Sequence, residues 1–285
     1  MIPNHIKSVI ELRLNDEIIS SDSQSGGDIN NASIIKLSAG ESFFLKWNSS
    51  APEYMFEAES KGLKILSEAN TDLVIPEVVE VGKDFLLLSL LIPGSANLES
   101  AYNFGTELAK LHKNSTDNFG LNHDNFIGKL SQSNYQHQNW ADFYISERIE
   151  PQIKLGIQYE KFGSGVHSKI ESLHKSATDI FPKEKPALLH GDLWSGNYMF
   201  TKNGDPSIYD PAIYYGHREM DIAMTRLFGG FSSDFYEGYN SEYPIAVGFE
   251  DRIELCNLYP ILVHANLFGG GYVNQATGIL DRYCS

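Results

Sequence analysis

The first third of the chain alternates short apolar and polar stretches, with polar or glycine-containing turns between them. Half-buried strands show such a period-two pattern, whereas helices repeat every three to four residues. The pattern predicts a short helix over 1–15, strands over 17–20, 32–37, 42–47, 76–81 and 85–91, and a helix over 52–70. Because the turns are short, we expect a five-stranded antiparallel meander with one helix inserted after the third strand.

The remainder of the chain is dominated by apolar residues at helical spacing. Helices are predicted over 102–112, 140–157, 162–181, 255–268 and 273–283, with another carrying residues from 222 onward. Short strand signals interrupt this helical part at 187–189, 198–200 and 207–209. Pro93 and Gly94 break regular structure between the two parts, and 119–134 is typical of a loop. We therefore predict an α+β protein with an N-terminal lobe over 1–91 and a mainly helical C-terminal lobe over 92–285.

The composition excludes several classes of partner. The chain has 285 residues, is 42% hydrophobic and 21% charged, and carries a formal net charge of −15. This acidity argues against nucleic acid or an anionic membrane as the main partner, because both are bound through clustered cations. The two cysteines form no disulfide framework, the N-terminus shows no leader pattern, and the longest apolar run, 85–93, is too short to cross a bilayer. We expect a cytoplasmic protein.

Candidate chemistry gathers in the turns around the three short strands. Asp192 and Asn197 follow the first of these strands, and Asp210 follows the third. The D-x-x-x-x-N spacing matches that of kinase catalytic loops, in which the Asp accepts the proton of the substrate hydroxyl and the Asn holds Mg²⁺. Asp210 lies where such kinases keep a second metal-binding carboxylate. We expect Asp192 to be the base and Asn197 and Asp210 to be metal ligands, with His190 bracing the loop through hydrogen bonds.

A lysine that could hold phosphates is found at position 46, in an otherwise apolar and aromatic strand. A strand lysine is more commonly a surface residue of an edge strand. The following helix, however, carries Glu57 and Glu59, and a strand lysine paired with a helix glutamate positions the α- and β-phosphates of ATP in kinases. We choose Glu59 as the partner of Lys46 and keep Glu57 as the alternative.

Two further segments would complete an ATP site. Gly26 and Gly27 lie in the loop between the first two strands, where glycine lets backbone amides approach a phosphate closely. A flexible turn without a function is the alternative interpretation of this pair. The residues that end the last strand, at the expected crossing between the lobes, would bind the adenine edge through their backbone groups; they are Ser89, Leu90 and Leu91.

Together these motifs resemble those of the fructosamine kinases (ketosamine 3-kinases), a branch of the aminoglycoside-phosphotransferase-like group with a protein-kinase-like fold. The H-G-D-x-x-x-x-N motif is shared with choline, aminoglycoside and homoserine kinases, whereas its filling, Leu193-Trp194-Ser195-Gly196, is narrow. The resemblance covers, in order, 44–46, 56–59, 126–128, 132–134, 140, 143, 190–197, 210–212, 215–219 and 267–271. The chain departs from the pattern at the hinge, where many members carry an acidic residue before the hinge leucine. His217 occupies a position that is Asp in many bacterial members and His in others.

The resemblance implies that ATP, with Mg²⁺, phosphorylates the 3-hydroxyl of a ketosamine. Fructosamine, ribulosamine or erythrulosamine adducts, free or as glycated lysine on a protein, would be substrates, and the 3-phosphate would then decompose and release the amine. Trp194 is a candidate wall for the sugar or, equally, a residue that packs the loop. Trp140 and Asn134 are further candidate substrate contacts, although aromatic residues at the spacing of Trp140 more commonly belong to a core.

Two other functions remain open at this point. A kinase of the same fold could act on another small hydroxyl compound of the aminoglycoside or choline type, and only the resemblance argues against it. A non-catalytic nucleotide-binding protein would be expected to lack at least one of the four residues Lys46, Asp192, Asn197 and Asp210, yet all are present. A protein kinase is disfavoured because no segment resembles an activation loop ending in A-P-E.

Overall fold

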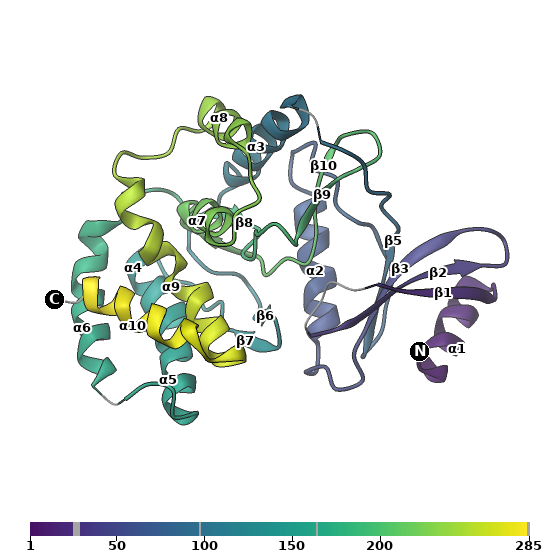
Figure 1. The fold of residues 1–285 in the computed structure, drawn as a ribbon, viewed down its shortest axis with the longest axis horizontal. Coiled ribbons are helices and arrows are strands. Elements are labelled where there is room, and N and C mark those ends of the chain that lie inside the picture. The colour runs from purple at the N-terminus through teal and green to yellow at the C-terminus, as the bar shows by residue number, and fades with distance from the viewer. Residues whose placement is uncertain (25–28, 97, 164, 284–285) are drawn as a thin grey trace.

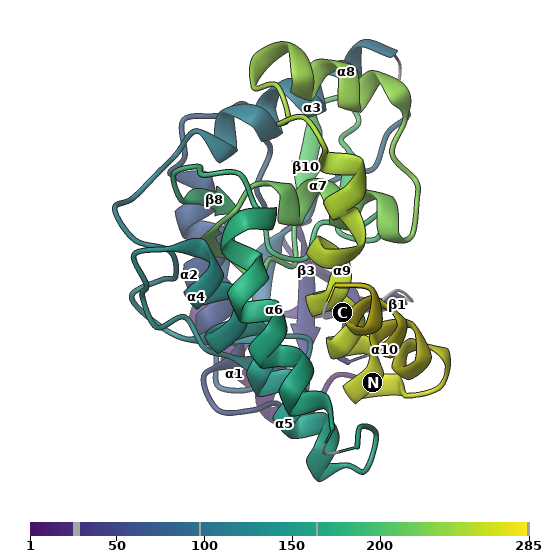
Figure 2. The same ribbon diagram turned by 90° about the vertical axis from the view of Figure 1, so that its left-hand side faces the viewer.

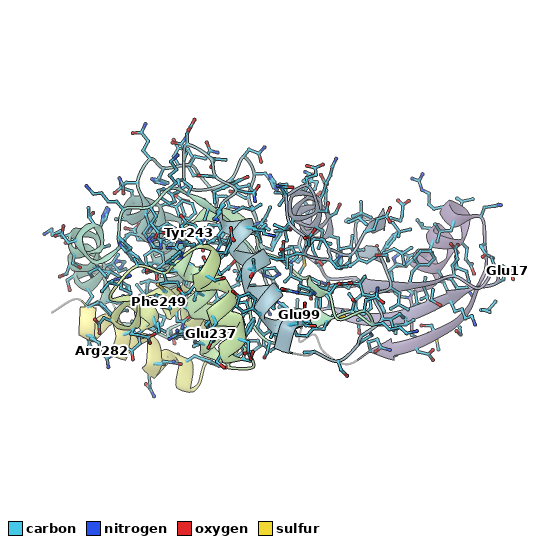
Figure 3. All side chains as sticks on the ribbon, turned by 90° about the horizontal axis from the view of Figure 1, so that it is seen from above. Glu17, Glu99, Glu237, Tyr243, Phe249 and Arg282 are labelled. Carbon is cyan, nitrogen blue, oxygen red and sulfur yellow. The ribbon has the colours of Figure 1, made fainter. Side chains whose placement is uncertain are left out.

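The computed structural model describes residues 1–24, 29–96, 98–163 and 165–283. A five-stranded antiparallel sheet with two helices occupies one end of the molecule, and a larger, mainly helical part occupies the other (Figure 1). Glu17 at the sheet end and Arg282 at the helical end lie far apart along the long axis (Figure 3). Within the described ranges, no helix is long and apolar enough to cross a membrane. The predicted α+β class and the predicted sheet are confirmed.

The sheet has the strand order β1-β2-β3-β5-β4, and all neighbouring strands are antiparallel. Its strands are β1 (Ile18–Gln24), β2 (Asn31–Leu37), β3 (Ser42–Trp47), β4 (Val78–Val81) and β5 (Phe85–Ser89). β5 is apolar at successive positions because both of its faces are buried. Phe85 and Leu87 join the cluster formed with α1 (Asn4–Leu14), and Leu86 and Leu88 join the one formed with α2 (Met55–Ser67). The sheet is thereby covered on both sides.

Two boundaries in this part differ from the prediction for local reasons. β1 continues to Gln24, which pairs with Ala32 of β2, so part of the predicted loop is strand. The predicted phosphate-binding glycines, Gly26 and Gly27, lie outside the described residues. α2 begins at Met55 rather than at residue 52, because Tyr54 has a φ of 65° and this left-handed conformation cannot continue a right-handed helix.

The helical part forms around one large apolar cluster. Its helices are α3 (Leu98–His112), α4 (Trp140–Phe143), α5 (Glu150–Gln158), α6 (Val166–Ile180), α7 (Glu219–Leu227), α8 (Ser233–Glu242), α9 (Phe249–Phe268) and α10 (Gly271–Tyr283). Three short antiparallel pairs accompany them: β6 (Asn125–Ile127) with β7 (Leu130–Gln132), β8 (Ala187–Leu189) with β11 (Tyr214–Gly216), and β9 (Tyr198–Phe200) with β10 (Pro206–Ile208). The turns that connect β8 to β9 and β10 to β11 hold the predicted site.

Three features of the helical part were not predicted. The 119–134 segment contains the hairpin β6–β7, and the helix predicted over 140–157 is interrupted by a π-helical turn, Tyr144–Ile149. α8 packs against α3 at one end of the molecule (Figure 2). An added Cβ at Gly238 of α8 would lie 2.0 Å from the carbonyl oxygen of Tyr102. A close glycine contact therefore joins α8 to α3, and it leaves a weaker periodic signal than an aliphatic stripe does.

Candidate active site

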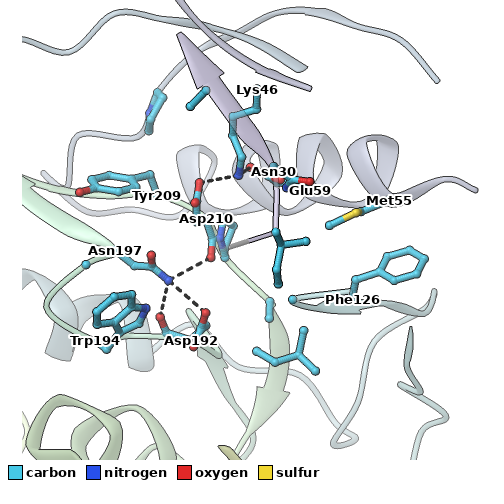
Figure 4. A pocket seen from close by; sticks show the side chains of 18 of the residues that line it. Asn30, Lys46, Met55, Glu59, Phe126, Asp192, Trp194, Asn197, Tyr209 and Asp210 are labelled. Carbon is cyan, nitrogen blue, oxygen red and sulfur yellow. Dashed lines mark hydrogen bonds and ion pairs between the residues drawn. The ribbon is translucent and has the colours of Figure 1, made fainter. Parts of the chain in front are cut away.

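A cavity of about 750 Å³ is lined by residues from both the sheet and the helical part (Figure 4). The predicted residues Lys46, Glu59, Asp192, Asn197 and Asp210 all line it. They come from β3, α2, the turn after β8 and the turn after β10, so segments far apart in the sequence meet at one place. The Ser89–Leu91 segment lines the same cavity and follows β5 directly.

Lys46 lies on an inner strand, between β2 and β5, rather than on an edge. Its Nζ atom donates to Glu59 Oε1 at 2.8 Å and to Asp210 Oδ1 at 2.8 Å. Burial opposes the charge of this lysine, but the two carboxylates outweigh it and raise the pKa of Lys46 above its ordinary value. Lys46 is therefore a fixed cation at the cavity wall.

Glu59 faces the lysine because of its position on α2. It lies three and four residues before Gly62 and Leu63, both of which are buried, so it shares their inward face. An added Cβ at Gly62 would lie 3.4 Å from Pro211, which shows how closely the helix approaches the segment after Asp210. Glu57 instead pairs with Lys61 at 2.7 Å on the solvent side. The choice of Glu59 over Glu57 agrees with the structure.

The turn after β8 places Asp192 beside Asn197. Asn197 Nδ2 donates to Asp192 Oδ2 at 3.1 Å and to the Asp192 carbonyl oxygen at 2.9 Å. Burial and the negative charge of Asp210 raise the pKa of Asp192 to about 7, although the Asn197 hydrogen bond opposes this shift. Asp192 is thus a carboxylate that can accept a proton near neutral pH, as a general base must.

Asp221, near the start of α7, holds the backbone of this turn through hydrogen bonds. Its Oδ2 accepts the His190 amide at 2.7 Å and its Oδ1 accepts the Gly191 amide at 2.9 Å. Gly191 has a φ of 83°, and a Cβ there would lie 2.0 Å from the carbonyl oxygen of Ala212, so only glycine fits. Asp221 therefore fixes the backbone of the turn by binding its amides.

His190 braces the turn through both ring nitrogens. Nε2 donates to the Tyr209 carbonyl oxygen at 2.9 Å, and Nδ1 accepts the Asp192 amide at 3.3 Å. Burial lowers the pKa of His190, so the neutral ring that these two bonds require is favoured. His190 therefore connects the segment carrying Asp192 to the segment carrying Asp210, in the bracing role predicted for it.

Asp210 adopts a φ of 56°, an uncommon conformation for a residue other than glycine. Its carboxylate and the Asn197 amide oxygen are the kinds of ligand that Mg²⁺ prefers. No group of three or more His, Cys, Asp or Glu side chains is placed to hold a metal ion in the described part of the chain. This fits Mg²⁺ in a nucleotide site, because the ion usually takes one or two protein ligands and completes its shell with phosphates and water.

Of the three candidate substrate contacts, the structure brings only Trp194 to the cavity. Trp140 is buried in the helical core, with its ring stacked on Tyr144 at a centroid distance of 5.3 Å. Asn134 is also buried; its Nδ2 donates to Asn125 at 2.9 Å and its Oδ1 accepts from Arg148 at 2.7 Å. Trp140 and Asn134 are therefore corrected to structural residues, because their neighbours in the core leave no face toward the cavity.

The network around Asn134 was not foreseen from the sequence. Asn125 donates to the Ile213 carbonyl oxygen at 2.8 Å, and Gln132 donates to that of Ala212 at 3.1 Å. These bonds fix the chain just after Asp210 against the β6–β7 hairpin. The only signal was the polar segment Gln132-Ser133-Asn134, which gives no indication of its partners. Cavity-lining Met55, Phe126 and Tyr209 were likewise missed (Figure 4).

A strand lysine paired with a helix glutamate, together with an Asp–Asn turn and a further Asp in the same cavity, is the arrangement of a kinase-type phosphotransferase site. A family model described as fructosamine kinase matches residues 1–285. The chain belongs to the fructosamine kinase family. Similar proteins include a probable ketoamine kinase of Vibrio parahaemolyticus, 38% identical over 92% of this chain and 91% of that protein. A chloroplastic protein-ribulosamine 3-kinase of Arabidopsis thaliana is 37% identical over 94% of this chain and 83% of that protein.

Solved structures agree with this assignment. A putative fructosamine-3-kinase of Thermobifida fusca has a TM-score of 0.87 at 28% identity, covering 98% of this chain and 100% of that one. A putative fructosamine-3-kinase of Haemophilus somnus has a TM-score of 0.88 at 26% identity, covering 98% and 97%. An aminoglycoside phosphotransferase bound to AMP-PNP and hygromycin B has a TM-score of 0.65 at 17% identity, covering 98% of each chain, and shares the fold.

Proposed function

We propose that this protein is a ketosamine 3-kinase, which transfers the γ-phosphoryl group of ATP to the 3-hydroxyl of a ketosamine. The observation that carries the proposal is the meeting of Lys46, Asp192, Asn197 and Asp210 in one cavity of a fructosamine kinase family member. Fructosamine, ribulosamine or erythrulosamine adducts, free or as glycated lysine on a protein, are the proposed acceptors. Spontaneous decomposition of the 3-phosphate would release the amine, so the outcome is deglycation.

Each described residue has a separate role in this proposal. Lys46, fixed by Glu59, holds the α- and β-phosphates of ATP. Asn197 and Asp210 would hold Mg²⁺, and the ion would supply positive charge that neutralises the phosphates of ATP. Backbone groups of the Ser89–Leu91 segment bind the adenine edge, and Gly26 and Gly27 are proposed to approach the phosphates.

Asp192 is the proposed base. Its carboxylate orients the 3-hydroxyl and takes its proton as the new O–P bond forms, while the bond from the γ-phosphorus to the leaving oxygen of ADP breaks. The Asn197 amide and the Asp221-bound backbone keep the carboxylate in position. Because phosphoryl transfer has a loose transition state, this positioning and charge neutralisation provide most of the rate acceleration.

Three further expectations accompany this function. The chain divides into an ATP-binding lobe over 1–91 and a catalytic lobe over 92–285. Trp194 is proposed to contact the sugar, since it lies two residues after the base and lines the cavity. The location is proposed to be cytoplasmic, on the basis of the cysteine content.

Purified protein with Mg-ATP should consume ATP when ribulosyl- or fructosyl-lysine is added, as measured by coupled ADP release. Asp192→Asn should lower kcat by about 10²–10⁴-fold, because it removes the general base while keeping the shape of the side chain. Asp117→Asn, at an exposed site outside the cavity lining, is the matched control and should leave kcat unchanged. Turnover of choline or an aminoglycoside, with none of any ketosamine, would refute the proposed acceptor class.

A further inference from the structure

Aromatic side chains from three helix ends form one wall of the cavity. We name this wall the aromatic shelf; it consists of Phe228, His264, Phe268 and Tyr272. The His264 ring is its centre, with centroid distances of 5.2 Å to Phe228, 5.6 Å to Phe268 and 5.0 Å to Tyr272. Trp194, two residues after the base, extends the row, since its ring lies 5.9 Å from that of Phe228. The shelf therefore adjoins the reacting end of the cavity.

The two phenylalanines of the shelf are exposed although they are apolar. Phe228 is 40% exposed and Phe268 is 53% exposed, values that are high for phenylalanine. Scattered exposed aromatics need no explanation, but a contiguous group at the wall of a ligand cavity marks a binding surface. Since these rings also line the proposed active site, their occupant is a part of the substrate itself.

The backbone holds the shelf in place before any ligand binds. Gly269 and Gly270 have φ values of 70° and 61°, and this glycine turn brings Tyr272 at the start of α10 beside Phe268 at the end of α9. His264 Nδ1 donates to the Pro260 carbonyl oxygen at 2.7 Å, which fixes the central ring. A preorganised wall of this kind loses little side-chain entropy on binding.

The charges around the cavity show what the shelf can bind. Among the described lining residues, the Asp, Glu, Lys and Arg side chains are Lys46, Glu59, Asp192 and Asp210. Lys46 bonds both Glu59 and Asp210, and Asp192 is the proposed base. No described carboxylate is therefore left at the cavity wall for a cationic part of the acceptor. Aromatic faces are the remaining groups there that attract a cation, through the ring quadrupole.

A ketosamine carries such a cation close to its reacting atom. Its nitrogen is bonded to C1, two carbons from C3, and a dialkylamine is protonated at neutral pH. With the 3-hydroxyl at Asp192, the nitrogen would stay within a few bonds of the base, and Trp194 connects the base to the shelf along the wall of the same cavity. Lysine presents an unbranched alkyl chain at this point, which suits an apolar wall.

We infer that the aromatic shelf is the amine subsite: it binds the protonated secondary amine by cation–π attraction and the first methylenes of its carrier by apolar contact. This inference rests on the proposed function and deepens it. The ligand class recognised is an alkylammonium group, so the α-amino and carboxyl groups of free lysine make no required contact. Glycated lysine in a peptide and a simple glycated alkylamine would thus occupy the subsite alike.

The test compares two ligands of the same shape that differ in charge. N-butyl ribulosamine carries the ammonium, and 1-O-butyl ribulose replaces it with a neutral ether oxygen. Their Kd values are measured by calorimetry with Mg-ADP present, so that no turnover is needed. Wild-type protein should bind the amine more tightly than the ether. Phe268→Leu and Tyr272→Leu should each reduce that preference by about 3- to 30-fold, the range expected for a lost cation–π contact.

Tyr159→Leu is the matched control, because Tyr159 is 54% exposed and does not belong to the described cavity lining. It should leave the amine-to-ether preference unchanged. The amine subsite is overturned if both shelf variants, with wild-type melting temperatures, keep the full preference, or if they weaken both ligands equally. Failure of the wild-type protein to turn over any ketosamine is a different result, since it refutes the proposed function and the subsite together.

Discussion

Two aspartates contact the same turn of the chain, and their pKa values shift in opposite directions. Asp221 lies beneath the turn; burial raises its pKa, but His112 and the turn amides donate hydrogen bonds that lower it overall. Asp192 lies on the cavity side, where burial and the charge of Asp210 raise its pKa to about 7. Burial raises the pKa of both carboxyls, so the donors and cations around Asp221 and the negative charge of Asp210 beside Asp192 decide the direction of each shift.

Two carboxylates that contact the same turn therefore differ: one stabilises the fold, and the other is reactive. Asp221 is a satisfied anion that fixes the backbone, and the fold is more stable for its charge. Among the described residues, the Asn197 amide is the side-chain donor to the Asp192 carboxylate, so this anion is poorly stabilised and takes up a proton readily. Poorly stabilised groups of this kind are typical of active sites, where function costs stability. Substitutions at the two sites should therefore move stability in opposite directions.

The largest effect on stability is expected for Asp221→Asn. The new amide group would replace an acceptor and face the amides of His190 or Gly191, or the His112 ring, leaving buried donors unpaired. We expect the free energy of unfolding to fall by about 2–4 kcal/mol. Urea unfolding at pH 8 measures this change, and kcat should fall with it because the turn is released. An unchanged unfolding midpoint would contradict the role given to Asp221.

Asp192→Asn should have the opposite sign in the same experiment. The folded pKa of Asp192 lies above the ordinary value of 3.8, so stability falls between about pH 4 and about pH 7, where the unfolded state has released this proton and the folded state still holds it. At pH 8 the asparagine variant avoids that loss. Allowing for solvent screening in the cavity, we expect a gain of about 1–2 kcal/mol in unfolding free energy. The gain should disappear near pH 4, and a loss at pH 8 would contradict the comparison.

The same raised pKa predicts a pH dependence of activity. Below about pH 7 the Asp192 carboxyl is protonated in the free protein and cannot accept the hydroxyl proton. The kcat/KM for ATP should therefore fall about tenfold per pH unit on the acid side. Carbon NMR titration of the nucleotide-free protein gives the pKa directly. Asp210→Asn should lower this pKa, since the charge of Asp210 is one cause of the shift; no change in the variant would exclude that cause.

The smallest effects concern the two glutamates of α2. Glu59→Gln weakens a buried, charge-assisted hydrogen bond to Lys46, so kcat/KM for ATP should fall by about 10-fold or more. Glu57→Gln removes only an exposed pair with Lys61, whose side chains are about half exposed, and should change kcat/KM by less than about twofold. Equal effects of the two substitutions would show that the Lys46–Glu59 pair does not position ATP.

Much of the site could be predicted because its residues lie in short local motifs. The turn from His190 to Asn197 sits directly after a strand, and its spacing alone fixes which side chains stand near each other. Glu59 was preferred over Glu57, and the structure agrees because helical periodicity places Glu59 on the face of Gly62 and Leu63. Strand and helix periods are encoded locally, so such expectations need no knowledge of distant partners.

Residues whose roles depend on distant partners were missed or misassigned. Trp140 and Asn134 were expected near the substrate, but Tyr144 and Arg148, brought in by the π-helical turn, bury them in the core. The aromatic shelf could not be inferred at all, since its rings come from three helix ends and meet only after packing.

The sequence by itself determined the sheet, the order of the elements and the identity of the groups that carry the chemistry. Only the tertiary structure decided which of them share a cavity and how strongly each holds its proton. The reason is physical: backbone periodicity depends on neighbours along the chain, whereas burial, ion pairing and hydrogen-bond donors depend on neighbours in space. Asp192 and Asp221 are the same residue type in the sequence, and their surroundings raise the pKa of the first and lower that of the second.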